Sequence, residues 1–168
     1  RNCLVGSEMC IRDSFEAIQP ILSKYDIPLI DDEVICGFGR TGNVWGAETF
    51  GMQPQSLTVA KALSSSYLPI SAVILSDEIY TPIAEKSGEL GIFGHGYTYG
   101  GHPVSCAVAL KTLEIYERDN ILGHTNTVSP TFQQRLNKCL DHKLVGHTRG
   151  VGLIGAIEFV SQQDSNKP

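Results

Sequence analysis

The sequence predicts an α/β fold in which helices cover both faces of a mainly parallel sheet. Two short apolar runs, residues 29–30 and 57–60, have the nearly continuous hydrophobicity of strands that are buried on both faces. Acidic residues 31–33 follow the first run, and Lys61 follows the second. Because open parallel sheets bind ligands beyond the carboxyl ends of their strands, these two ends form the predicted functional site.

The elements around these strands can be predicted in chain order. Apolar residues recur at helical spacing within 15–25, and residues 26–28 end that helix before the first strand. Residues 71–76 predict a third buried strand. A helix is expected from Asp77, with acidic residues in its first turn.

The second half of the chain predicts two helices and two strands. The clearest helix opens at Pro103, because proline suits the first helical position. Residues 119–120 mark a boundary, and a second amphipathic helix is expected near 130–140. Residues 145–150 and 152–160 then predict strands separated by glycine.

The charged residues at the two strand ends suggest a cofactor. A lysine there is partly removed from water, which makes its amine available to form a Schiff base with an aldehyde. A carboxylate on the neighbouring strand end can keep a pyridine nitrogen protonated, so that the ring takes up electrons. Lys61 and Asp32 therefore suggest pyridoxal 5'-phosphate, although their spacing alone does not establish it.

Three motifs strengthen this hypothesis. Residues 32–42, 59–63 and 94–103 closely resemble, in this order, the class III aminotransferases, also called the omega-aminotransferase group, of pyridoxal-phosphate fold type I. The resemblance covers residues 15–160. It implies transamination, in which an amino group moves from an amine or omega-amino acid to a 2-oxo acid such as pyruvate or 2-oxoglutarate.

The resemblance also implies roles for four residues. Lys61 would hold the cofactor aldehyde and then carry the proton as the base, and Asp32 would keep the ring nitrogen protonated. Val34 would pack on the ring face. Thr98 would bind the cofactor phosphate of the neighbouring subunit, which implies a homodimer with its active site at the subunit interface.

The chain is expected to be a fragment with three parts. Residues 3–14 resemble a translated sequencing adaptor, so that 1–14 is treated as a non-native segment outside the fold. Residues 15–118 are expected to form part of the cofactor-binding large domain. Residues 119–168 are expected to begin a truncated small α+β domain.

Three alternative functions are open at this point. An aminomutase of the same family shifts an amino group within one molecule, and the chain as it stands could be a catalytically inert fragment. The spacing Gly37-x-Gly39-x-x-Gly42 also matches a dinucleotide-binding oxidoreductase. That hypothesis is the weakest, because acidic residues 31–33 stand where a pyrophosphate would approach.

Composition excludes several classes of partner. The 168 residues are 42% hydrophobic with a net charge of -5, and no basic run or long apolar run suggests nucleic acid or a membrane. A cytoplasmic enzyme is expected. Five cysteines without CxxC spacing predict reduced thiols, and His95, His102 and Cys106 lack a suitable fourth ligand for a metal.

Overall fold

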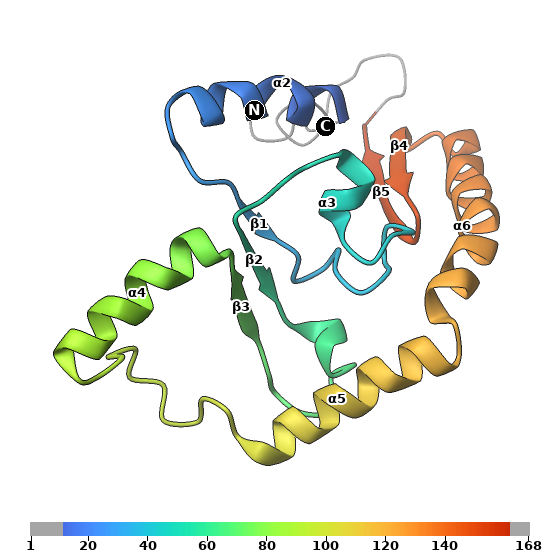
Figure 1. Ribbon diagram of the computed structural model, residues 1–168. Coiled ribbons are helices and arrows are strands. Elements are labelled where there is room, and N and C mark those ends of the chain that lie inside the picture. The colour runs from blue at the N-terminus through green and yellow to red at the C-terminus, as the bar shows by residue number, and fades with distance from the viewer. Residues whose placement is uncertain (1–11, 162–168) are drawn as a thin grey trace.

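The computed structural model describes residues 12–161 (Figure 1). Most of the predicted adaptor segment, residues 1–11, lies outside the described residues, and residues 12–14 form the first turn of helix α2. The elements in chain order are α2 (Arg12–Lys24), β1 (Ile30–Asp32), α3 (Gly46–Phe50), β2 (Ser56–Val59), η1 (Lys61–Leu63), β3 (Ala72–Leu75), α4 (Asp77–Leu90), α5 (Pro103–Arg118), α6 (Ile121–Asn137), η2 (Lys138–Asp141), β4 (Val145–Val151) and β5 (Ile154–Phe159).

The central sheet has three strands in the order β1-β2-β3. β1 runs parallel to β2, with Asp32 aligned to Thr58, which confirms the predicted parallel pair. β3 pairs antiparallel with β2, so that this part of the sheet is mixed. The prediction that β3 is buried is wrong for this chain, because Val73 is 64% exposed and Ile74 is 44% exposed.

A small hydrophobic core lies where the carboxyl end of β2 meets α5. Val59, Leu63 and Ala109 are buried together, and four partly buried residues pack against them, namely Phe38, Trp45, Ile70 and Leu113. The core therefore joins β2, the turn after it, α5 and the segment that follows β1. This packing fixes the position of the strand ends relative to α5.

The second long helix begins earlier than predicted. The expected helix near 130–140 is in fact α6, Ile121–Asn137, with Pro130 in its interior. Asn120 begins it, because the Asn120 side chain accepts a hydrogen bond from the Gly123 amide at 3.2 Å. The proline suggested a helix start, but the asparagine cap ten residues upstream determines it.

The predicted C-terminal strands form the hairpin β4–β5, which lies between α6 and the α3 region in Figure 1. Gln133 on α6 donates hydrogen bonds from Nε2 to the carbonyls of Gly152 and Ile154, both at 2.9 Å. At the hairpin turn, the Leu153 amide donates to the Arg40 carbonyl at 2.9 Å. The hairpin is therefore held both by α6 and by the glycine-rich turn that follows β1.

Candidate functional site

The structure brings two of the predicted site residues to neighbouring strand ends. Asp32 is the last residue of β1, and Lys61 begins η1 directly after Ala60 at the carboxyl end of β2. Because β1 and β2 are parallel neighbours, both residues lie at the same edge of the sheet. The sequence-based prediction that these residues share one edge is thus confirmed.

The carboxylate of Asp32 is held on one side and open on the other. Its Oδ1 accepts hydrogen bonds from the Thr58 hydroxyl at 3.0 Å and from the Val34 amide at 3.1 Å. Its Oδ2 accepts no hydrogen bond within residues 12–161, and the residue is exposed. Oδ2 can therefore accept a hydrogen bond from a protonated ring nitrogen.

Lys61 stands on a sharply bent turn. Its backbone φ is +41°, and Ser65 and Ser66 in the same turn also have positive φ values of 49° and 64°. Non-glycine residues adopt this left-handed conformation at an energetic cost, and such residues concentrate at functional sites. The side chain of Lys61 is exposed, so the described residues do not supply the burial that the sequence predicted for it.

A tyrosine on α5 anchors the lysine turn. The Tyr116 hydroxyl donates to the Ala62 carbonyl at 2.7 Å and lies 2.7 Å from the Ser65 hydroxyl, which is then the donor of that pair. The Ser64 hydroxyl donates to the Leu68 carbonyl at 2.7 Å and is buried. Side-chain hydrogen bonds from both sides thus offset the cost of the strained backbone.

A group of acids and a thiol lies next to Asp32. Glu33 is 1% exposed, and its Oε1 accepts a hydrogen bond from the Ala47 amide at 2.8 Å. Burial and the neighbouring carboxyl group of Glu33 raise the pKa of Asp31 to about 6. Burial and the negative charges of Glu33, Asp31 and Asp32 raise the pKa of the Cys36 thiol.

The glycine-rich segment forms a tight turn rather than a dinucleotide site. Gly39 and Gly42 have φ values of 107° and 102°, which favour glycine. No helix begins at Gly42, since α3 starts four residues later and has only five residues. A dinucleotide fingerprint requires the glycines to lead directly into a helix, so the structure disfavours the oxidoreductase hypothesis.

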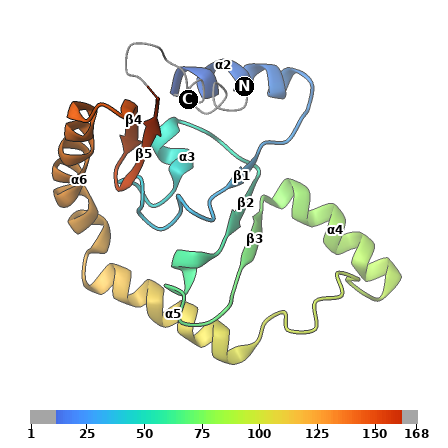
Figure 2. The same ribbon diagram turned by 180° about the vertical axis from the view of Figure 1, so that it is seen from behind.

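Thr98 lies in the irregular segment 91–102, which joins α4 to α5 (Figure 2). Every residue of this segment is exposed, and no hydrogen bond joins Thr98 to Asp32 or Lys61 in the described part of the chain. The described residues therefore show no hydrogen bond that would fix Thr98 at the strand ends.

Sequence reasoning missed the residues that hold the Asp32 side chain and the backbone of the Lys61 turn. Thr58 was identifiable in principle, because alternation along the aligned strands places it beside Asp32. Tyr116 gave no signal, since it is 54 residues from the carbonyl that it contacts. Within residues 12–161 no group of three or more histidine, cysteine or acidic side chains could hold a metal ion.

One hollow among the described residues lies away from this edge. It measures about 490 Å³ and is lined by residues that precede β1 and β2, such as Leu29 and Gln55, together with Gln19 on α2 and Glu78 on α4. These residues lie at the amino ends of the strands. The hollow is therefore separate from the edge that carries Asp32 and Lys61.

The observed arrangement is a parallel strand pair of an α/β sheet with a carboxylate at one carboxyl end and an exposed lysine at the other. Comparison with known families is consistent with this: the model of the class-III aminotransferases matches residues 6–168. The chain belongs to the class-III aminotransferase family. Its fold is a part of the fold type I of pyridoxal-phosphate-dependent transferases.

Curated relatives are named as transaminases. The chain is 51% identical over 154 residues to gamma aminobutyrate transaminase 3, chloroplastic, of Solanum lycopersicum, covering 92% of this chain and 30% of that protein. It is 47% identical to the vanillin aminotransferase of Capsicum chinense, covering 92% of this chain and 34% of that protein. The chain thus spans about a third of the length of these relatives.

Solved structures agree with the curated relatives. A thermostable omega transaminase from Pseudomonas jessenii, a four-fold mutant, is 46% identical with a TM-score of 0.90, covering 94% of this chain and 35% of that one. The omega-transferase of Vibrio fluvialis JS17 is 40% identical with a TM-score of 0.84, covering 92% and 36%. Among the described residues, no helix is long and apolar enough to cross a membrane.

Proposed function

We propose that this chain is the cofactor-binding part of an aminotransferase that uses pyridoxal 5'-phosphate. The observation that carries the proposal is the pairing of Asp32 and Lys61 at the ends of two adjacent parallel strands. The overall reaction moves an amino group from an amine or omega-amino acid to a 2-oxo acid such as pyruvate or 2-oxoglutarate. The names of the relatives support this class of reaction.

The residues present fit this cofactor on two observations. Asp32 is exposed and its Oδ2 accepts no hydrogen bond within residues 12–161, and Lys61 is exposed at the adjoining strand end. When bound, pyridoxal phosphate supplies an aldehyde that reacts with primary amines and a ring that takes up electrons. The two ends of the cofactor thus match the two functional groups at this edge.

Asp32 and Lys61 have separate tasks. Asp32 would accept a hydrogen bond from the ring nitrogen, while Thr58 and the Val34 amide hold its other oxygen in place. The Lys61 amine would bond to the cofactor aldehyde and, when it is free, would accept and return a proton at Nζ. The fixed turn of residues 61–68 keeps the amine within reach throughout.

Two further residues complete the proposed site. Val34 comes two residues after Asp32 and is half-buried, and its side chain is proposed to pack on one face of the ring. Thr98 is proposed to bind the cofactor phosphate of a partner subunit. The full exposure of segment 91–102, with Tyr97 at 77% and Tyr99 at 82%, supports a homodimer in which a second copy covers this segment.

The aminomutase alternative is not favoured, because the similar curated proteins described above are named transaminases.

For location, we keep the cytoplasm as the sequence-based proposal, while the names of relatives include chloroplastic and mitochondrial proteins. Imaging of a fluorescent fusion of the complete gene product tests it. Signal confined to an organelle would contradict the cytoplasmic proposal.

The first test of the function is chemical labelling of Lys61. The complete gene product is incubated with pyridoxal phosphate and reduced with borohydride, and the modified peptides are identified by mass spectrometry. We expect the label on Lys61 and its loss in the Lys61→Arg variant, whose guanidinium keeps the charge but does not react with the aldehyde. Label spread over exposed lysines such as Lys111, unchanged in the variant, would overturn the proposal.

A further inference from the structure

Two carboxyl groups next to Asp32 take no part in the proposed chemistry. Side chains alternate along a strand, so Asp31 and Glu33 lie on the face of β1 opposite to Asp32. The Glu33 side chain is almost fully buried and Asp31 is half-buried. Within residues 12–161, Asp31 Oδ2 and Glu33 Oε2 are both buried, and neither has a hydrogen-bond partner.

Two ionised carboxylates cannot satisfy each other, because each offers only acceptors. One proton changes this, since a protonated carboxyl group donates to the other and satisfies both buried oxygens at once. The two groups lie within hydrogen-bonding reach, and their interaction favours the protonated form of Asp31. The arrangement is therefore that of a carboxyl pair which retains a proton.

We propose that Asp31 and Glu33 hold one proton between them, and that this makes Glu33 a positioning residue for the turn that carries Asp32. The Glu33 backbone amide donates to Thr58, the Gly37 amide donates to the Glu33 carbonyl, and the Glu33 side chain holds the Ala47 amide. Glu33 thus joins β2, the glycine-rich turn and α3. The inference does not depend on which cofactor binds.

Among residues 12–161, no basic group contributes to the raised pKa of Asp31, so none neutralises the pair. The neighbouring titratable groups are Asp32, whose negative charge raises the pKa of Asp31, and Cys36, whose thiol pKa is itself raised by the carboxylates. β2 carries no titratable side chain, and Glu48 on α3 accepts from the Trp45 amide. On α5, Lys111 and Glu114 pair with each other in solvent. A proton is therefore the group available to neutralise the pair.

The sign of the pH dependence follows from the pKa of Asp31, which rises from 3.8 to about 6 on folding. The folded state binds this proton more tightly than the unfolded chain does. The contribution to stability is complete below about pH 4, declines as the pH rises from about 4 to 6, and is lost above that range. The complete gene product should accordingly lose thermal stability over this interval.

The variant Asp31→Asn tests the shared proton directly. Its amide group donates to Glu33 at every pH, so we expect the decline between about pH 4 and 6 to disappear and the unfolding midpoint at about pH 8 to rise by roughly 2–4 °C. Asp31→Ala, which offers no donor, should lower the midpoint in acid instead. Asp141→Asn removes an exposed carboxylate and should leave the decline unchanged.

A spectroscopic measurement on the parent protein tests for the shared proton even when a variant fails to fold. Infrared spectra of protein with isotope-labelled aspartate, titrated between about pH 8 and pH 4, should show one carboxyl group gaining its proton near the pKa of about 6. A titration in which every aspartate gains its proton near the ordinary value of 3.8 would falsify the proposal. An Asp31→Asn variant that keeps the full pH dependence would do the same.

Discussion

The turn that carries Lys61 and the segment 91–102 that carries Thr98 are both irregular, but they are held in different ways. The Lys61 turn is joined to α5 by the Tyr116 hydroxyl and closed by the buried Ser64. In segment 91–102, by contrast, all residues are exposed and the ring contacts are made among neighbours such as His95 and Tyr97. The Lys61 turn is thus fixed by distant parts of this chain, whereas the ring contacts of segment 91–102 stay within the segment.

The largest effect should come from the hairpin turn that contacts the glycine-rich turn. A Cβ on Gly152 would lie 2.5 Å from the Arg40 carbonyl and 2.8 Å from Thr41 Cα, so Gly152→Ala should lower the free energy of unfolding by about 3 kcal/mol. Gly101 in segment 91–102 is the matched control. Its φ of +69° resembles the +58° of Gly152, but a Cβ added to Gly101 would have no atom of the described residues within 4 Å.

Gly101→Ala should therefore cost only the conformational term of roughly 1 kcal/mol. Chemical unfolding of the complete gene product, parent and both variants together, measures the difference. Equal losses in the two variants would contradict the claim that only the Gly152 region is tightly packed.

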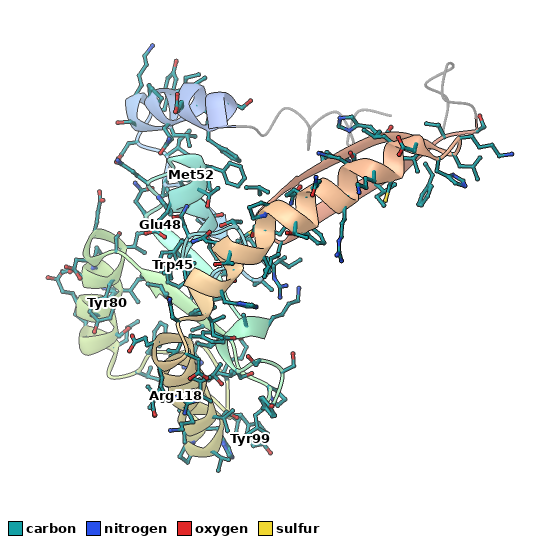
Figure 3. All side chains as sticks on the ribbon, turned by 90° about the vertical axis from the view of Figure 1, so that its right-hand side faces the viewer. Trp45, Glu48, Met52, Tyr80, Tyr99 and Arg118 are labelled. Carbon is teal, nitrogen blue, oxygen red and sulfur yellow. The ribbon has the colours of Figure 1, made fainter. Side chains whose placement is uncertain are left out.

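An intermediate effect is expected at Tyr116. The substitution Tyr116→Phe removes the hydroxyl that contacts Ala62 and Ser65, and should cost about 2 kcal/mol, because both groups lose a hydrogen-bond partner. Tyr80→Phe is the control, since Tyr80 lies on the surface of α4 and is 56% exposed (Figure 3). Thermal unfolding compares the two, and a loss of similar size for Tyr80→Phe would show that the anchor is unimportant.

The smallest effect on stability is expected at Thr98, where a substitution should change only the affinity for the cofactor. Because Thr98 is exposed, Thr98→Val should leave unfolding of the cofactor-free protein unchanged. If Thr98 binds the phosphate of the partner subunit's cofactor, the affinity of the Thr98→Val variant for pyridoxal phosphate should fall about tenfold. This corresponds to the loss of one charge-assisted hydrogen bond. Titration of each variant with pyridoxal phosphate, followed by absorbance, measures this affinity. Thr131→Val, at an exposed position on α6, is the control. Equal affinity in the two variants would remove Thr98 from the proposed site.

Local patterns in the sequence predicted the elements that depend on local chemistry. The apolar runs predicted β1 and β2, and Pro103 marked the start of α5. The direction of β3 was beyond such reasoning, because an apolar run looks the same whether its strand is parallel or antiparallel. The α6 start was missed, since Pro130 gave a stronger signal than the asparagine cap at Asn120.

In the candidate site, too, the features that depend on local sequence were predictable and those that depend on distant segments were not. Asp32 and Lys61 were predictable, because parallel strands bring their carboxyl ends together whatever the rest of the chain does. The contacts of Tyr116 and the approach of Gly152 to Arg40 depend on segments more than 50 residues apart, so no local pattern encodes them. The four assigned roles stay predictions until the site is labelled.

The cysteine beside the acids gives the chain an internal chemical reporter. Alkylating reagents react with the thiolate, and the raised pKa of Cys36 keeps this thiol protonated at neutral pH. Cys36 should therefore be alkylated slowly while the surrounding packing is intact. A sudden gain in its reactivity would report the opening of this region long before the whole protein unfolds.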